Sequence, residues 1–194
     1  MKNPFNPGYY QTCDLLALGF CGVGENVKIA KNTTLIGLKN IFLGSNVRID
    51  GFTSIIASSK GQCIIGSNVH IGSNCFMSCA ENIILSDFAG LSHGVKIYTK
   101  SDDYSGKFLT NPTVPEEYTS KDIGSVTLGK HVIIGSNSII LPGVTIGNGT
   151  AVGALSLVTK SLGEWSIFFG SPAKYLKKRS KELLMLENKY LSEE

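Results

Sequence analysis

The chain has 194 residues, of which 42% are hydrophobic and 17% charged, and its net charge is +3. This length suits one domain with its own core, and so mild a charge, with the basic residues near the C-terminus, excludes the basic stripe of a nucleic-acid-binding protein. With 22 glycines and no Gly-X-Y period, the composition favours many tight turns over collagen or disorder.

The first twenty residues form an N-terminal segment that contains no apolar run suited to a signal peptide. No other segment approaches the roughly 18 apolar residues of a membrane span. The cysteines are odd in number and lack a C-x-x-C pair, which predicts buried free thiols in a reducing compartment. We therefore expect a cytoplasmic protein without a membrane span. The cysteines are Cys13, Cys21, Cys63, Cys75 and Cys79.

From residue 21 onward an aliphatic residue or Met recurs every six positions, often followed by glycine. Such a short period is typical of solenoids, in which each repeat buries its apolar residue against its neighbours. The register consists of Val23, Ile29, Leu35, Leu43, Ile49, Ile55, Ile65, Ile71, Met77, Leu85, Leu91, Ile97, Leu128, Ile134, Ile140, Ile146, Val152 and Val158.

The period is interrupted only after a third hexapeptide, where the interval lengthens to eight, ten, eight and then thirty-one residues. Three hexapeptides therefore make one triangular coil, and all insertions leave from the same corner. Short parallel strands stacked roughly 4.8 Å apart place the aliphatic residues in a narrow core. We predict one all-β domain, 1–194, a parallel β-helix of about six coils in residues 21–99 and 126–163.

The longest interruption, residues 100–125, is an inserted loop with two adjacent aspartates, Asp102 and Asp103, at its entrance. A long insertion in a compact repeat is usually functional, so we expect this loop to form a substrate pocket. Tyr98, Tyr104 and Asn111 are its candidate substrate contacts.

The tail, residues 171–191, is predicted to be helical. Ser171 before Pro172 is typical of an N-cap and first-turn pair, and Leu183, Leu186 and Tyr190 follow at helical spacing. We expect this helix to cap the open end of the prism, as the terminal units of solenoids do.

The segment "VTLGKHVIIGSNSIILPGVTIGNGTAVGALSLVTKS", followed by "FFGSPAKYLKK", resembles the acetyl-CoA half of the hexapeptide-repeat acyltransferases. The chain looks most similar to their galactoside and maltose acetyltransferase branch and to sugar O-acetyltransferases of polysaccharide synthesis. The resemblance spans roughly residues 20–178. It implies a left-handed parallel β-helix, acetyl-CoA as co-substrate, and a homotrimer with active sites between subunits.

Within this resemblance, Ser136 and Ala154 match positions whose backbone groups hold the pantetheine arm. The register supports the match, because both residues lie two places after a second-face aliphatic residue and so stack in adjacent coils. Such a column of small residues is a groove for an extended amide chain, although ordinary turn chemistry also explains it. The CoA phosphates should fall near Lys160, Lys174, Lys177 and Lys178; a solvated helix face is the alternative.

The catalytic base of the family is a histidine in a T-x-x-H-P-like segment, and Asp102 occupies that place here. His93 shares the column of Ser136, one coil below, so we predict it to be the base. Asp102 or Asp103 would then orient His93 or hold the acceptor. Alternatively, the two carboxylates crowd each other and raise a pKa, or are only acidic turn residues.

Two functions follow. The first is acetyl-CoA-dependent acetylation of a sugar hydroxyl, in a polysaccharide or its precursor. The alternative is N-acetylation of a nucleotide-linked amino sugar, which the missing histidine favours because a neutral amine needs less help from a base. A zinc carbonic anhydrase requires three converging histidines, whereas His70, His93 and His131 lie in different columns, so we expect no metal. A non-catalytic scaffold would lack a reason for the long loop.

Overall fold

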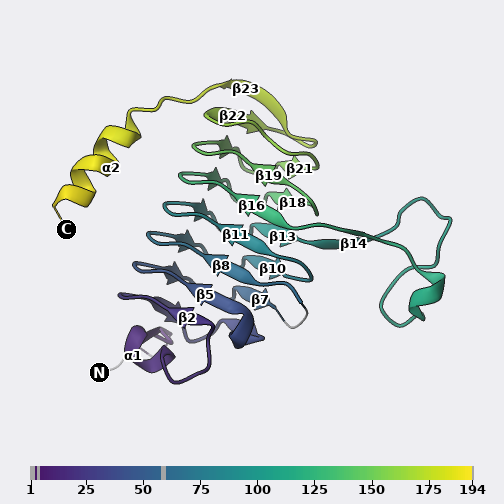
Figure 1. Ribbon diagram of the computed structural model, residues 1–194, viewed down its shortest axis with the longest axis horizontal. Coiled ribbons are helices and arrows are strands. Elements are labelled where there is room, and N and C mark those ends of the chain that lie inside the picture. The colour runs from purple at the N-terminus through teal and green to yellow at the C-terminus, as the bar shows by residue number, and fades with distance from the viewer. Residues whose placement is uncertain (1–2, 4, 58–59, 194) are drawn as a thin grey trace.

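The computed structural model describes residues 3, 5–57 and 60–193, and these form a triangular prism of stacked coils (Figure 1). Each coil runs through three faces, which we call B, A and C in chain order. Face B comprises β2 (Gly22–Val23), β5 (Ile41–Leu43), β8 (Cys63–Ile65), β11 (Ile83–Leu85), β16 (Val126–Leu128) and β19 (Thr145–Ile146). Face C comprises β4 (Thr34–Ile36), β7 (Ser54–Ile56), β10 (Phe76–Ser78), β13 (Lys96–Tyr98), β18 (Ile139–Ile140) and β21 (Leu157–Val158).

Face A is larger, with nine strands. Its parallel strands are β3 (Lys28–Ala30), β6 (Arg48–Ile49), β9 (His70–Ile71), β12 (Gly90–Leu91), β17 (Ile133–Ile134), β20 (Ala151–Val152) and β22 (Ser166–Phe169). Two antiparallel strands flank them: β1 (Tyr9–Gln11) beside β3, and β23 (Lys174–Lys178) beside β22. Leu162, which pairs with Ile146 on face B, and strand β22 on face A thus belong to a seventh turn beyond the six coils predicted; the aromatic residues of β22 hide the hexapeptide pattern.

The predicted aliphatic register forms the core. Its members are buried except Val23 and Leu35 of the first coil, which pack against the core partly buried. Equivalent positions pair strand by strand, as in Leu91 with Ile134 and Ile134 with Val152. The parallel β-helix predicted from the period and its interruptions is therefore confirmed.

The N-terminal segment closes the first coil. The short helix α1 (Thr12–Leu15) follows β1 and places Leu15, 1% exposed, against the core. A 3₁₀ turn, η1 (Leu38–Asn40), joins faces C and B. The cysteines are free as predicted, but only three are buried, because Cys13 and Cys21 lie exposed at this end.

The inserted loop has structure of its own. Residues 100–125, which we call the arm, begin and end with antiparallel strands β14 (Lys100–Asp102) and β15 (Lys121–Ile123), with a 3₁₀ turn η2 (Glu116–Tyr118) near the tip. The arm leaves the prism after face C and projects away from the coils (Figure 1).

The C-terminal tail differs from the predicted helix. Residues 174–178 are strand β23, and the helix α2 covers only Leu183–Ser192. The reason is that β22 would otherwise leave a row of unpaired backbone groups at the end of face A, and β23 supplies partners for them. The prism end is thus closed by a hairpin, and α2 runs back beside the coils (Figure 1). Within the described ranges no helix is long and apolar enough to cross a membrane.

Candidate active site

A column of residues runs along the edge between faces A and C. The carbonyl of His93 accepts a hydrogen bond from the backbone N–H of Asn137 at 2.9 Å, and the carbonyl of Ser136 accepts one from Leu155 N–H at 2.9 Å. His93, Ser136 and the coil of Ala154 are therefore stacked as the register predicts. The roles predicted for them remain predictions.

Glycines before this column bring its backbone close together. A Cβ atom at Gly135 would lie 2.4 Å from the backbone nitrogen of Ala154, so no side chain fits there. Asn137 and Leu155 continue the two turns with φ values of 58° and 57°. The column therefore presents backbone and small side chains, as an extended amide ligand requires.

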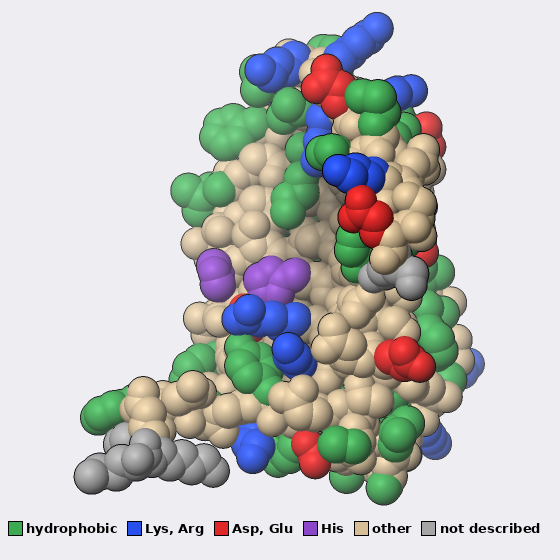
Figure 2. Space-filling view, turned by 90° about the vertical axis from the view of Figure 1, so that its left-hand side faces the viewer, with side chains coloured by type: hydrophobic (Ala, Val, Ile, Leu, Met, Phe, Trp, Pro, Cys, Tyr) green, Lys and Arg blue, Asp and Glu red, His purple; other side chains and the backbone are tan. Residues whose placement is uncertain are grey.

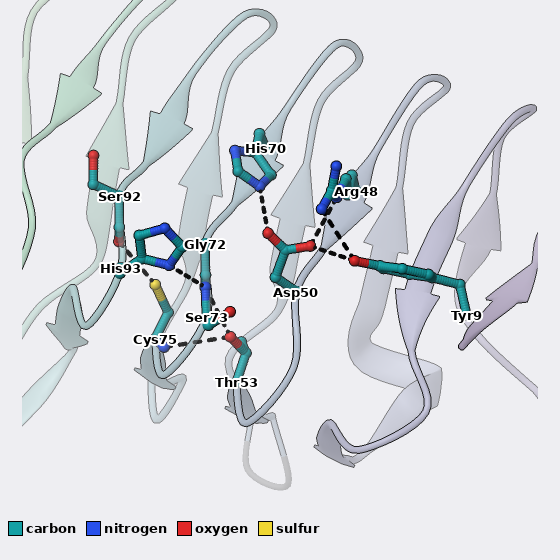
Figure 3. Close-up of polar contacts among 10 residues, drawn as sticks. All are labelled: Tyr9, Arg48, Asp50, Thr53, His70, Gly72, Ser73, Cys75, Ser92 and His93. Atoms are coloured by element: carbon teal, nitrogen blue, oxygen red, sulfur yellow. Dashed lines mark hydrogen bonds and ion pairs between the residues drawn. The ribbon is translucent and has the colours of Figure 1, made fainter. Parts of the chain in front are cut away.

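His93 is held by an unexpected partner. Its Nδ1 accepts a hydrogen bond from the backbone N–H of Ser73 at 3.0 Å, and its ring is exposed (Figure 3). In a neutral imidazole only one nitrogen carries hydrogen, so the proton lies on Nε2. The free nitrogen of His93 is therefore a hydrogen-bond donor, and this geometry does not favour the predicted base role.

The two aspartates of the arm have different surroundings. Asp103 accepts hydrogen bonds from the N–H and, at 2.5 Å, the hydroxyl of Ser105, which is the arrangement of an acidic turn residue. Asp102 accepts a hydrogen bond from the backbone N–H of Asn111 at 3.2 Å. In the part of the chain described here, neither aspartate contacts His93. A hollow of about 360 Å³ at the arm's base is lined by Ser78, Lys100, Ser101, Asp102, Pro112 and Lys121.

The three predicted substrate contacts have different surroundings. Tyr98 packs on Phe76 with ring centroids 5.6 Å apart on face C. Tyr104 is 92% exposed on the arm. The side chain of Asn111 accepts two hydrogen bonds from Thr113 and so shapes a turn.

The predicted CoA lysines gather at the C-terminal end of the prism. Lys160 follows β21, and the other three lie on β23, which pairs with β22 next to the coil of Ala154. All four are exposed, and none lies on a helix, so the alternative of a solvated helix face does not apply to them. They are Lys160, Lys174, Lys177 and Lys178.

A polar cluster that the sequence analysis missed lies on face A, nearer the N-terminus (Figure 3). Asp50, 7% exposed, accepts hydrogen bonds from Arg48 Nε at 2.7 Å, Tyr9 Oη at 2.8 Å and His70 Nε2 at 2.8 Å. Burial alone would raise the pKa of the Asp50 carboxyl, but the hydrogen bonds from His70, Tyr9 and Arg48 outweigh burial and lower it. The sequence did contain a signal for this cluster, because Arg48 and His70 each directly precede an aliphatic residue of the second face and therefore stack in adjacent coils.

The third histidine, His131, contacts the helix α2 through Glu187. His131 Nε2 lies 2.8 Å from Glu187 Oε2, Lys130 pairs with the other carboxylate oxygen, and the His131 ring stacks on Phe88. A hollow of about 430 Å³ separates α2 from face A. Figure 2 shows histidine side chains beside Lys and Arg side chains at the lower end of a hollow in this surface. The three histidines thus have different partners, and the described residues contain no metal-binding group of three or more side chains.

Comparisons with known proteins agree with this architecture. The bacterial transferase hexapeptide (six repeats) family matches residues 125–160. The chain is 41% identical over 180 residues to dTDP-4-amino-4,6-dideoxy-D-glucose acyltransferase of Escherichia coli, covering 93% of each protein.

Solved structures give the same result. The N-acyltransferase AntD of Bacillus cereus, in complex with dTDP and 3-hydroxybutyryl-CoA, is 40% identical, with a TM-score of 0.92 over 97% of this chain and 98% of that one. A maltose O-acetyltransferase of Clostridium difficile 630 is 24% identical, with a TM-score of 0.58 over 87% and 74%, and shares the fold.

Proposed function

Since this chain belongs to the hexapeptide-repeat acyltransferases and acts on a sugar, we propose that it transfers an acyl group from acyl-CoA to the amino group of a nucleotide-linked amino sugar. A sugar hydroxyl was the first expectation. The relative that is 41% identical over nearly the whole chain is an amino-sugar acyltransferase and supports the amine instead.

The observation that carries this proposal is the orientation of His93. A hydroxyl is a poor nucleophile that needs a base, whereas an unprotonated amine attacks with its own lone pair. Because Nδ1 of His93 already accepts a hydrogen bond from the Ser73 N–H, the ring offers no free lone pair to a hydroxyl. An amine acceptor does not need a base to take its proton before it attacks.

The geometry suits the following reaction. Pantetheine lies along the Ser136 and Ala154 column, with the CoA phosphates near the lysines of β23, and the thioester reaches His93. The amine attacks the thioester carbonyl, and the exposed Nε2–H of His93 donates a hydrogen bond to the carbonyl oxygen as it becomes negative. The C–N bond forms, the C–S bond breaks, and the proton released by nitrogen passes to the sulfur, giving an amide and free CoA thiol.

Our proposal includes a second copy of the chain in the acceptor pocket. The arm projects away from the coils of its own chain (Figure 1), so in a homotrimer the arm of one subunit would cover the column of another. The arm exposes apolar side chains that a neighbouring subunit would cover; Phe108, Leu109, Tyr118 and Ile123 are 48% to 57% exposed. We place this enzyme in the cytoplasm, as its free thiols suggest.

The test is acceptor screening with the purified protein. Release of CoA thiol is measured with acetyl-CoA or 3-hydroxybutyryl-CoA as donor, and with dTDP-4-amino-4,6-dideoxyglucose or maltose as acceptor. We expect rapid thiol release only with the amino sugar, and the better donor identifies the acyl group. Transfer to maltose at a higher kcat/KM would refute the proposal and restore the hydroxyl acceptor.

A further inference from the structure

The N-terminal half of face A carries a basic column. Lys28 pairs with Arg48, and Arg48 pairs with His70, so the three side chains stand in line on the outer surface of β3, β6 and β9. The next position along the column is Gly90, which has no side chain. The column of basic side chains thus ends at the hollow between face A and α2, where a Cβ atom on Gly90 would lie 3.0 Å from Ile133 Cδ1.

In the Asp50 cluster the hydrogen-bond acceptor is buried, whereas the basic side chains that donate to it are exposed. The carboxylate of Asp50 is 10% exposed, while the side chains of Arg48 and His70 are 56% and 52% exposed. Both oxygens of Asp50 are occupied, and Tyr9 adds a bridge by accepting a hydrogen bond from Arg48 at 3.1 Å. The negative charge therefore serves to orient two basic groups toward the surface.

Each basic group keeps a free nitrogen. Arg48 engages Nε and one terminal nitrogen, which leaves the other terminal nitrogen for a ligand. His70 engages Nε2 in its hydrogen bond with Asp50, so Nδ1 faces outward, and in a protonated ring this Nδ1 would also donate. An arginine and a histidinium held in fixed positions are suited to phosphate oxygens.

The cluster of Asp50, Arg48 and His70 lies on the side of His93 that faces away from the predicted CoA lysines. Figure 3 shows Gly72 and Ser73 between this cluster and His93. A Cβ atom at Gly72 would be 2.9 Å from the backbone nitrogen of His93, so this stretch stays free of a side chain. An acceptor that approaches His93 from this side meets glycine backbone first and the Arg48–His70 pair next.

We propose that Arg48 and His70, oriented by Asp50, bind the diphosphate of a nucleotide-linked sugar and so place the sugar beside His93. This inference rests on the proposed function and names the subsite for its acceptor. CoA enters from the C-terminal end of the column and the nucleotide from the N-terminal end, and the two substrates meet at His93.

The test uses a variant that preserves the cluster. His70→Gln keeps an amide N–H near the position of Nε2 for Asp50 but removes the outward ring nitrogen. The control, Lys39→Gln, places a glutamine at an exposed basic residue of η1 at another corner. Binding of dTDP, thymidine and CoA is measured by calorimetry on the folded proteins, whose melting temperatures are compared first.

We expect His70→Gln to weaken dTDP binding and raise KM for the amino-sugar nucleotide by about tenfold, because charge-assisted hydrogen bonds to the diphosphate are lost. Thymidine and CoA binding should not change, and Lys39→Gln should match the wild type. Unchanged dTDP affinity in a folded His70→Gln protein would overturn the subsite alone. A wild type that turns over no amino-sugar nucleotide would overturn the proposed function as well.

Discussion

At the scale of single residues, two histidines illustrate how one hydrogen bond decides which ring nitrogen remains for a ligand. Nδ1 of His93 accepts a hydrogen bond from the Ser73 N–H, and Nε2 is exposed. In His70 it is Nε2 that donates to the Asp50 carboxylate, and Nδ1 is exposed. The neutral forms therefore present opposite functions to a ligand: His93 donates and His70 accepts. Spacing along the chain places the two rings in different columns but does not show which nitrogen of each ring is free.

Substitutions of His93 separate a donor from a base. His93→Gln places an amide N–H near the position of Nε2, whereas His93→Asn reaches only the position of Nδ1. We expect His93→Gln to keep kcat within about tenfold of the wild type, and His93→Asn to lose about 10²-fold or more, as for a donor to a developing oxyanion. The measurement is kcat for thiol release with the amino-sugar nucleotide.

The same two variants also give the contrary outcome. If His93 were the base, His93→Gln and His93→Asn would be equally inactive, because neither amide side chain can accept the proton of the acceptor.

Asp50 is expected to contribute to stability in a pH-dependent way. Because its pKa is lowered in the folded state, the contribution is present above the unfolded pKa of about 3.9 and is lost as pH falls through the folded pKa. Asp50→Asn should lower the free energy of unfolding by about 1–3 kcal/mol at pH 7, since it weakens hydrogen bonds to charged groups. Urea unfolding at pH 7 and pH 3.5 tests this: the difference from wild type must shrink in acid.

At the scale of elements, α2 depends on its attachment to the coils. A helix of 10 residues is too short to be stable alone in water. Glu187, 8% exposed, joins it to Lys130 and His131, while Tyr190 meets the edge of the Phe88 ring. Lys130 first, and then His131, lower the pKa of the Glu187 carboxyl in spite of its burial.

Glu187→Gln is therefore expected to release α2 from the prism without unfolding the coils. The measurement is hydrogen exchange of the α2 amides at pH 7, which should become at least about tenfold faster, while amides of the core strands keep their protection. Glu193→Gln is the matched control, because Glu193 is 67% exposed and only reaches Lys189 at 4.0 Å. Equal exchange in both variants would show that apolar packing alone holds the helix.

The arm is expected to be separable from the coils. Residues 104–118 contribute nothing to the core, so their replacement by a short Gly-Ser turn between β14 and β15 should leave the melting temperature of the coils and their affinity for CoA unchanged. The same change should abolish transfer to the amino sugar. If the shortened protein kept the wild-type KM for the amino-sugar nucleotide, the arm would not be part of the acceptor pocket.

At the scale of the whole molecule, the active site we propose is complete only in an oligomer. The column lies on the edge between faces A and C, whereas the arm leaves the prism after face C and projects away from the coils (Figure 1). We therefore expect that the arm does not cover the column of its own chain. We expect sedimentation equilibrium to give about 62 kDa, three times the chain mass of 20.8 kDa. A 20.8 kDa species with full activity would contradict the shared site.

The sequence by itself determined the prism and the columns along it. A hexapeptide register repeats the same local choice many times, so Leu91, Ile134 and Val152 identify one another as neighbours without any knowledge of the fold. The corner of the insertions, the stacking of His93 below Ser136 and the outlet of the arm follow from that periodicity, because each strand pairs only with the coil before and after it.

Tertiary structure decided what periodicity does not encode. Strand β23 formed because β22 left a sheet edge to be paired, and α2 turned back because Glu187 meets His131, 56 residues earlier. Asp50 is bound by Tyr9 from 41 residues away, and the nitrogen that His93 exposes depends on a backbone N–H in the preceding coil. Such contacts join residues that share no register position, so their chemistry emerges only when the coils are stacked and the termini are folded against them.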